Sequence, residues 1–224
     1  MTISVQGIGW VTGEGFGGIA GGIHRRFVPG EGADHLARMG IFSHPFRNFG
    51  RLDGISKLTV SAVALALRDG GVDYSPAFRQ DTGIIGTSSA GSLVSDCDYF
   101  RDYLDNGRTL SRGNLFIYTL PSSPLGEAAI HFGLMGPLLY AAGKEPVLVP
   151  VLEMAGEMLS AGETDRVLAG TAGDRAALYL LLGREHGGSS LCSLDDVVAV
   201  AGREPGIADM VEELTILKGK KGAA

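Results

Sequence analysis

The two side chains best placed to do chemistry are Lys144 and Glu145, which lie in a short Gly-Lys-Glu-Pro turn. A strand is expected before this turn at Leu138–Ala142, and a buried helix after it at Val151–Leu159. Many α/β enzymes present a nucleophile at such a strand–turn–helix, because the bend exposes one side chain and the helix N-terminus favours developing negative charge. This turn offers no cysteine or serine, and adjacent opposite charges in a turn are most often simply solvated.

The elements that must position this turn are strongly apolar. In the helix at Val151–Leu159, only Glu153, Glu157 and the following Ser160 interrupt apolar residues that lie on nearly every side. This pattern predicts a helix that sheets or partners bury from several directions. A second strand is expected at Arg166–Ala169, which completes a strand–turn–helix–strand unit.

The rest of the chain alternates between expected strands and helices, which favours an α/β layered fold. The helix at Ile55–Asp69 has Ser56 as its expected N-cap and is expected to end at the glycine pair 70–71. Further strands are expected at Thr2–Val11, Asp81–Ser88, Asp174–Leu182, Leu194–Gly202 and Thr215–Lys218. Further helices are expected at Ser92–Leu104 and Leu125–Phe132, and an extended segment at Asn114–Pro124.

A glycine-rich segment follows the first expected strand. Gly13, Gly15 and Gly18 fit the G-x-G-x-x-G spacing of dinucleotide-binding turns. Such a site also requires a helix next, and then a strand that ends in an acid about 20 residues on. The chain instead continues through a polar segment broken by Pro29. We therefore interpret the segment as a flexible glycine turn rather than a nucleotide site.

The histidines and cysteines form no recognisable catalytic or metal pattern. His24, His35 and His44 lack the i, i+4 spacing of a helical metal pair, so we expect loop or surface residues and no metal or other cofactor. His131 lies beside an aromatic residue and is expected to be packed. Cys97 lies between two aspartates that disfavour a thiolate, so we expect a half-buried helix residue and not a nucleophile.

The composition is that of a globular protein with a generous core. The chain has 224 residues, of which 45% are hydrophobic and 20% charged. This length suits one domain or a large half of a two-domain protein. The formal net charge of −6 argues against nucleic acid as the main partner. Two cysteines, the absence of a signal-peptide pattern and the absence of a membrane-length apolar run lead us to expect a cytoplasmic protein with reduced thiols.

Five motifs follow one another along the chain: ISVQGIGWVTGEG, RLDGISKLTVSAVALALRDGGVD, TGIIGTSSAG, LPSSPLGEAAIHFGLMGP and AGETDRVLAG. Together they resemble the β-ketoacyl synthases of the thiolase-like superfamily. The resemblance covers about residues 3–183, in the family's order and spacing, and leaves a C-terminal extension at 184–224. It implies a single domain over residues 1–224 with a thiolase-like half-fold, namely a mixed five-stranded sheet with helices on both faces.

The chain departs from the family's pattern at the catalytic positions. The resemblance places Glu145 where the family has its acyl-accepting cysteine, with Lys144 beside it. Pro146 and Pro150 change the start of the next helix, which we expect near Pro150. The family's two catalytic histidines belong to a second half, and neither motif is present. The resemblance also implies residues that line an acyl pocket, namely Thr87, Ser88, Tyr140, Gly143, Glu145 and Val149.

Three functions remain open from the sequence. The first is a non-catalytic synthase-like subunit for fatty acid or polyketide-type chain assembly, which binds acyl chains or an acyl carrier protein as chain length factors do. The second is an acyl- or malonyl-thioester enzyme, an acyltransferase or decarboxylase, that uses Glu145 or Cys192 and borrows groups from a partner. The third is an unrelated ligand-binding or structural protein. Because a missing second half would leave Val151–Leu159 bare, we expect a homodimer or a heterodimer with another ketosynthase-like chain.

Overall fold

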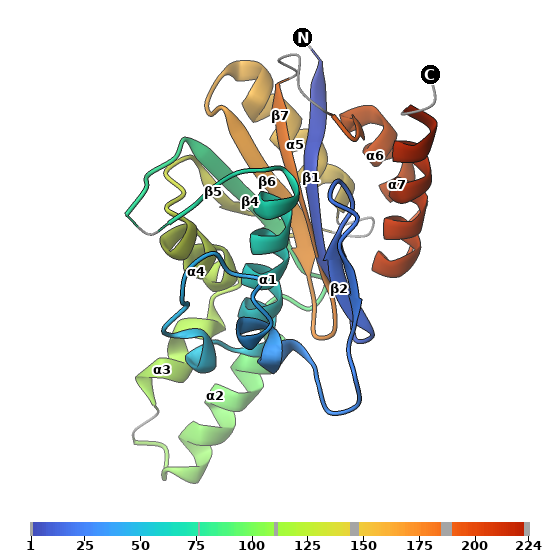
Figure 1. Ribbon diagram of the computed structural model, residues 1–224. Coiled ribbons are helices and arrows are strands. Elements are labelled where there is room, and N and C mark those ends of the chain that lie inside the picture. Colours follow the sequence, from blue (N-terminus) through green and yellow to red (C-terminus); the bar gives the residue numbers. More distant parts are fainter. Residues whose placement is uncertain (1, 76, 110–111, 144–147, 185–189, 222–224) are drawn as a thin grey trace.

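The computed structural model describes residues 2–75, 77–109, 112–143, 148–184 and 190–221. They form one mixed β-sheet with helices on both faces (Figure 1). The predicted α/β class and the two-sided helix layers are therefore confirmed. Lys144 and Glu145 lie outside the described residues. Within the described part of the chain, no helix is both long enough and apolar enough to cross a membrane.

The sheet has eight strands, so the prediction of five strands was wrong. The strands are β1 (Ile3–Val11), β2 (Gly15–Gly18), β3 (His24–Arg26), β4 (Thr82–Thr87), β5 (Leu138–Tyr140), β6 (Arg166–Ala172), β7 (Ala177–Arg184) and β8 (Cys192–Ser193). Their order is β3-β2-β1-β7-β6-β4-β5, and β8 pairs with β1. The extra strands come from the β2–β3 hairpin and from β8, which are too short to give a clear sequence period.

The strand directions bring several strand ends to one edge. β4 is parallel to both β5 and β6, whereas β7 is antiparallel to β6 and to β1. β1, β4, β5 and β6 therefore all run in the same direction. Their carboxyl ends meet at one edge of the sheet, which is where α/β folds commonly place a functional site.

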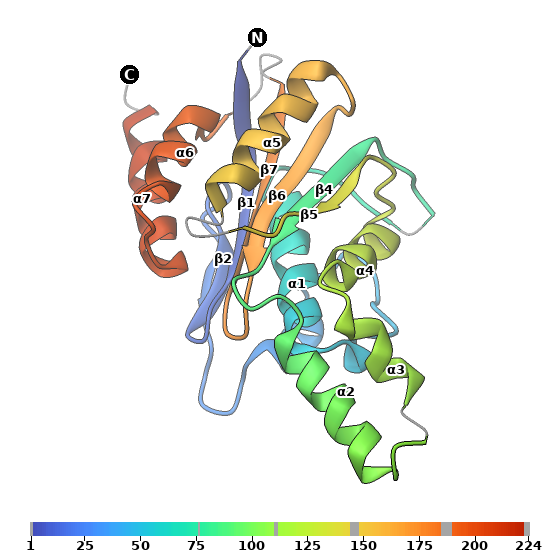
Figure 2. The same ribbon diagram turned by 180° about the vertical axis from the view of Figure 1, so that it is seen from behind.

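The helices form a layer on each face. They are α1 (Gly54–Asp69), α2 (Leu93–Asp105), α3 (Gly113–Phe116), α4 (Ser123–Phe132), α5 (Leu148–Ala161), α6 (Leu194–Ala201) and α7 (Ile207–Lys221), with short 3-10 helices at 33–38, 49–51 and 117–119. α1 and α4 cover one face, while α5, α6 and α7 cover the other (Figures 1 and 2). Each layer has its own apolar core, built around Leu67, Phe132 and Tyr179 on one side and Leu152, Leu180 and Leu214 on the other.

Helix α1 is buried along almost its whole length. Its N-cap is Asp53, whose carboxylate accepts a hydrogen bond from the Ser56 N–H at 2.9 Å, so the prediction of Ser56 as the cap was wrong. The helix ends at the predicted glycine pair, where Gly71 has a φ of 66°. Gly9 of β1 lies so close to α1 that a Cβ there would overlap the carbonyl oxygen of Ala62. Small residues on both elements therefore set the close packing of α1 on the sheet.

The glycine-rich segment forms the β2–β3 hairpin, so the interpretation as a flexible turn was wrong. Its turn wraps around the carboxylate of Asp69 at the end of α1. This carboxylate accepts hydrogen bonds of 2.9–3.1 Å from four backbone N–H groups, those of Ile8, Ile19, Ala20 and Gly21. The chain's own aspartate thus occupies the position that a phosphate would take in a glycine-rich nucleotide loop.

The C-terminal extension is helical. The strand predicted at Leu194–Gly202 is α6, and the strand predicted at Thr215–Lys218 belongs to α7. A capping box starts α6: the Ser193 hydroxyl accepts from the Asp196 N–H, and the Asp196 carboxylate accepts from the Ser193 N–H. This cap decides for a helix in an apolar run whose period alone is ambiguous.

Two further segments can be compared with the sequence predictions. The segment predicted to be extended, Asn114–Pro124, contains most of α3 and a 3-10 helix. Helix α5 is helical from Leu148, in agreement with the predicted start near Pro150. Pro150 fits within this first turn, because the N–H groups of a first helical turn have no partner inside the helix and nothing is lost when proline lacks one.

Candidate functional site

The predicted pocket residues Thr87, Ser88 and Tyr140 lie together at the carboxyl ends of β4 and β5. Gly86 of β4 pairs with Tyr140 of β5, which places the Tyr140 ring beside the chain that leaves β4. The Tyr140 hydroxyl donates a hydrogen bond to the Ser88 carbonyl oxygen at 3.2 Å. The Thr171 hydroxyl of β6 donates to the Thr87 carbonyl at 3.3 Å. Three neighbouring strands therefore fix the backbone of this corner.

The described side chains of this corner can bind polar groups but do not form a nucleophile–base pair. Burial raises the pKa of the Tyr140 phenol. Tyr140 is therefore a neutral hydrogen-bond donor at physiological pH. The buried Ser88 hydroxyl has no hydrogen-bond partner among the described residues. Without a neighbouring base it is not activated for attack, but it can bind a carbonyl or hydroxyl group of a ligand.

The remaining predicted site residues flank the turn that follows β5. Gly143 is exposed at the end of the described segment, and Val149 packs against the apolar core beneath α5. Lys144 and Glu145 belong to the stretch outside the described residues. The place of Glu145 in the pocket, with Lys144 beside it, therefore stays a prediction from the resemblance.

Neither cysteine belongs to this corner, and neither is in a disulfide. Cys97 is exposed on α2, so the prediction of a half-buried residue was wrong. Cys192 is buried in β8 and pairs with Val5 near the start of β1. That position is at the opposite end of the sheet from Ser88 and Tyr140, so Cys192 cannot replace a nucleophile at this corner.

The prediction that His131 is packed was correct. Its ring stacks on Phe46 with centroids 3.9 Å apart and on His44 at 4.6 Å. Burial, with a smaller contribution from His44, lowers the pKa of His131 to about 4. The ring is therefore neutral at physiological pH. Across the described segments, no three His, Cys, Asp or Glu side chains come together as a metal site.

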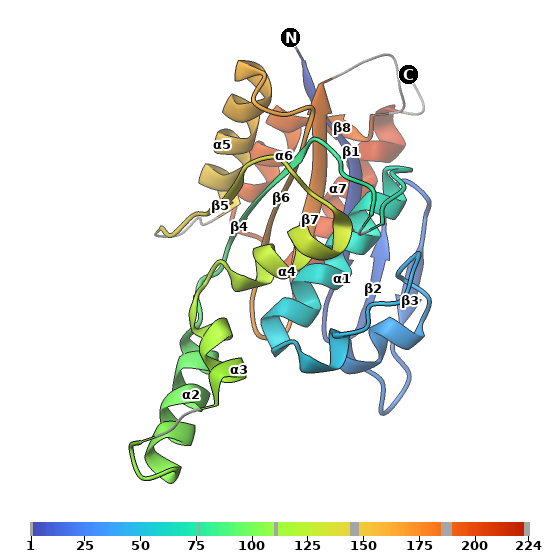
Figure 3. The ribbon, with the colours of Figure 1, turned by 90° about the vertical axis from the view of Figure 1, so that its left-hand side faces the viewer.

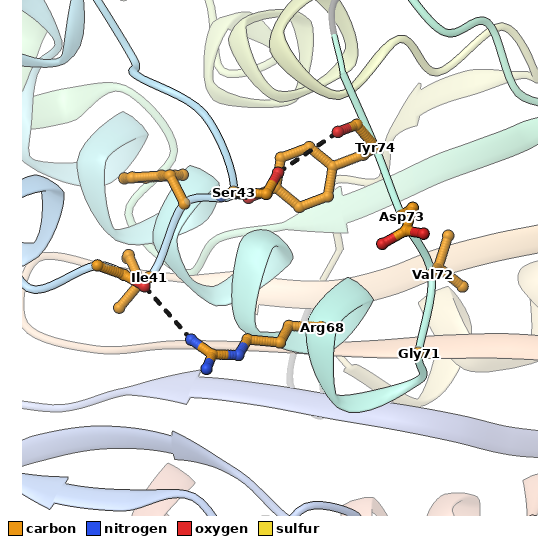
Figure 4. Close-up of a pocket in the computed structure, with 9 residues that line it drawn as sticks. Ile41, Ser43, Arg68, Gly71, Val72, Asp73 and Tyr74 are labelled. Atoms are coloured by element: carbon orange, nitrogen blue, oxygen red, sulfur yellow. Dashed lines mark hydrogen bonds between the residues drawn. The ribbon is translucent and has the colours of Figure 1, made fainter.

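A separate cavity of about 400 Å³ lies between residues 40–43 and the end of α1 (Figure 4). Its polar groups largely bond to one another. The Arg68 guanidinium donates to the Gly40 carbonyl at 3.3 Å, the Ser43 hydroxyl to the Tyr74 carbonyl, and the Ser43 N–H to the Tyr74 hydroxyl at 3.1 Å. We interpret this cavity as a structural joint between the loop and α1.

The outer face of α5 does not form the bare apolar patch that we expected. Half of its exposed residues are polar, namely Glu153, Glu157 and Ser160, and they alternate with Pro150, Met154 and Ala161. On its other side α5 packs against α6, where a Cβ at Gly156 would lie 2.7 Å from a methyl carbon of Leu194. The C-terminal extension thus covers one flank of α5, while the outer face of this helix stays exposed.

The exposed apolar surface lies instead on α2. Leu93, Cys97, Phe100 and Leu104 recur at helical spacing, and all of them are exposed. We call this set the α2 stripe. The opposite side of α2 is held by polar contacts, such as the Ser95 hydroxyl to the Asp53 carboxylate at 2.7 Å. α2 and α3 project from the body as an arm in which no residue of either helix is fully buried (Figure 3).

The sequence carried the signal for this surface, because apolar residues at i, i+4, i+7 and i+11 mark one face of a helix. That pattern ordinarily indicates a face turned toward the protein's own core. Here the face points to solvent, which the sequence alone does not reveal. More apolar side chains are exposed beside the arm on α3, the following 3-10 helix, α4 and β5, namely Phe116, Ile117, Leu120, Ile130, Leu138 and Leu139.

Comparisons with known proteins identify the fold. No family model matches the chain, and no curated protein matches it in sequence. Among solved structures, the ishigamide ketosynthase/chain length factor superposes with a TM-score of 0.65 at 18% identity, over 85% of this chain and 64% of that chain. A β-ketoacyl synthase from Burkholderia phymatum superposes with a TM-score of 0.60 at 16% identity, over 82% of this chain and 59% of that chain. A ketosynthase in complex with its chain length factor from Xenorhabdus doucetiae superposes with a TM-score of 0.56 at 15% identity, over 84% of this chain and 81% of that chain.

The chain spans less than two thirds of the length of the first two of these structures. At such low identity the likeness establishes the arrangement of strands and helices. The five sequence motifs run in the same order through that arrangement, from β1 to β6. The chain therefore has the thiolase-like fold of the β-ketoacyl synthases.

Proposed function

We propose that the chain is a non-catalytic ketosynthase-like subunit that takes part in fatty acid or polyketide-type acyl-chain assembly. The observation that carries this proposal is the corner formed by Thr87, Ser88 and Tyr140. It retains hydrogen-bonding groups at the carboxyl ends of β4 and β5, yet its described residues include no cysteine or histidine. By resemblance, Glu145 takes the place of the nucleophile. A carboxylate is a weak acyl acceptor, and its acyl product would be a reactive anhydride.

The same proposal includes a partner, because the arm is poorly stabilised by the chain itself. An isolated helix of 13 residues is marginal in water, and α2 has no fully buried residue to anchor it. The α2 stripe offers exposed apolar side chains, and the edge strand β5 offers exposed leucines and an unpaired edge. A ketosynthase-like chain, either a second copy or a different subunit, would cover both features. An acyl carrier protein would then deliver the growing acyl chain to the site that the two subunits share.

Intact mass spectrometry tests the proposal. The purified chain is incubated with acyl- and malonyl-loaded carrier protein, and both denatured and native masses are recorded. We expect no covalent adduct and no loss of the malonyl group, together with a native dimer or a complex. An adduct, or consumption of malonyl, would instead support an acyl- or malonyl-thioester enzyme, and peptide mapping would locate the acylated residue.

Two variants separate these outcomes. Any activity that Glu145→Ala abolishes, while Glu153→Ala on the outer face of α5 leaves it unchanged, would assign chemistry to Glu145 and contradict a non-catalytic role. A chain that stays monomeric at all concentrations and binds neither carrier protein nor a ketosynthase would overturn the subunit proposal. That outcome would favour a ligand-binding or structural protein.

A further inference from the structure

A cavity of about 470 Å³ lies between the N-terminal hairpin and α7, away from the corner described above. Figures 1 and 2 both show α7 beside β1 and β2. The strand register sets Trp10, Gly17 and His24 in one row, and Gly15 and Arg26 in the next. The opposite wall is one face of α7, whose lining residues are spaced as i, i+3, i+4, i+7 and i+8, namely Ala208, Val211, Glu212, Thr215 and Ile216.

Hydrogen bonds at one end of α7 fix the two walls relative to each other. The Lys218 ammonium donates to the carbonyl oxygens of Ile19 and Ala20 at 2.7 and 2.8 Å. The N–H groups of the same two residues bind the Asp69 carboxylate. The hairpin turn is therefore held both to α1 and to α7. The cavity is preformed, and its volume lies within the range of small-molecule sites.

Trp10 supplies a polar group that points to a ligand. The residue is only 6% exposed, and its side chain lines the cavity. The ring makes an edge contact with His24, with centroids 5.1 Å apart. None of the hydrogen bonds formed within the described chain involves its indole N–H. The indole nitrogen is not among the buried unpaired polar atoms of the described residues, so its N–H is open to the cavity and can donate to an acceptor atom bound there.

The two walls differ in chemistry. The sheet wall carries the donors, which are the Trp10 indole N–H, the His24 ring and the Arg26 guanidinium. The helix wall is mainly apolar. Glu14 and Glu212 also line the cavity, so Arg26 can pair with a single ligand carboxylate while the further negative charges of a polyanion such as a nucleotide are repelled. We infer that this cavity binds an apolar monocarboxylate of metabolite size, with its carboxylate toward Arg26 and its apolar body along α7.

Fluorescence measures this binding directly, because Trp10 is the only tryptophan of the chain. The full chain is titrated with octanoate and with 4-phenylbutyrate, and octanamide serves as a neutral probe of matched length. We expect a saturable change in Trp10 emission with both carboxylates. Octanamide should bind at least about tenfold more weakly, because it cannot form the charge-assisted pair with Arg26.

Two neighbouring arginines provide matched variants. Arg26→Gln should weaken carboxylate binding about tenfold. Arg25 belongs to the other face of β3, over the Phe16 ring and 3.9 Å from Glu31, so Arg25→Gln should leave the affinity unchanged. Thermal unfolding of both variants verifies that they are folded, and Ala208→Leu, which fills the cavity, should abolish the response without disturbing the hairpin.

No saturable change at millimolar carboxylate would overturn the inference. Equal affinity for octanamide, or an equal loss in both arginine variants, would also overturn it. The measurement uses neither a partner nor a thioester, so its result is independent of the proposed subunit role.

Discussion

Asp69 is the residue on which the N-terminal third of the molecule depends most. It joins β1, the hairpin turn and α1 through four N–H donors, and a glycine-rich turn can wrap this closely around a carboxylate because it has few side chains in the way. The glycine spacing is visible in the sequence, but the sequence does not show which anion the glycine-rich turn binds. A G-x-G-x-x-G match describes where the backbone can bend, whereas the anion that it encloses comes from a residue about 50 positions later.

We expect Asp69→Ala to lower the free energy of unfolding by about 3 kcal/mol, because it leaves several backbone donors without an acceptor. Chemical denaturation monitored by circular dichroism measures this change. The control is Asp73→Ala, an exposed aspartate four residues on, which should stay within about 0.5 kcal/mol of the parent chain. Equal effects of the two substitutions would show that the carboxylate network contributes nothing.

His131 makes the stability of the chain dependent on pH. Its pKa of about 4 in the folded state lies below the usual value of 6.5, so the unfolded chain binds the proton more tightly. The free energy of unfolding that is linked to neutral His131 is fully present above pH 6.5. It falls by roughly 3 kcal/mol as the pH decreases toward 4. Denaturation midpoints measured across this range should decline. The His131→Leu variant should decline less steeply, and His24→Gln should behave as the parent chain does.

At the scale of elements, the strands and helices with a clear period were predicted well and the short ones were not. β1, β4, β6, α1, α4 and α5 lie where the apolar pattern placed them, because each buries a continuous face. The pattern failed at α6, where the five-residue apolar run at 197–201 fits a strand as well as a helix, and the capping box favours the helix. It also failed at β2 and β3, which have only four and three residues and are joined by a turn that binds Asp69.

The α2 stripe yields a prediction about association. Phe100→Asp places a charge in the middle of the stripe, so we expect binding to a ketosynthase-like chain, or to a second copy, to weaken about tenfold or more. Sedimentation velocity of the chain alone, and mixed with a ketosynthase of the same cell, measures this. Val28→Asp changes an equally exposed apolar residue in a loop outside the arm and should have no effect. Unchanged association in Phe100→Asp would remove the arm from the interface.

The role of α7 as a cover can be tested by shortening the chain. A chain that ends at Gly202 loses the buried side chains of Met210 and Leu214, which stabilise the fold by about 4 kcal/mol together. We expect a lower unfolding temperature and a red shift of Trp10 emission, since the ring loses its cover. A chain that ends at Lys221 retains α7 and should unfold as the full chain does.

At the scale of the whole molecule, the sequence predicted the layered fold but not how the molecule closes. The resemblance implied that half a synthase needs another half, and on that basis α5 was expected to be bare. In the structure the outer face of α5 is exposed but only partly apolar, and α6, from the 184–224 extension that no motif described, packs along its flank. The candidate corner was predictable in part: Thr87, Ser88 and Tyr140 converge because parallel strands end together, whereas the loss of solvent from Ser88 depends on packing that no sequence pattern encodes.

The two open edges of the sheet have consequences for how many copies can assemble. β3 presents His24, Arg25 and Arg26, and a run of exposed basic residues opposes the addition of another strand. β5 presents Leu138 and Leu139 at the other edge, where no such charge opposes pairing. A protein with one edge strand that can pair forms dimers and no larger species, whereas a protein with two such edge strands would grow into fibres. Concentrating the protein should therefore produce a two-chain species at most, and neutralising the three basic residues should convert this closed assembly into an open-ended polymer.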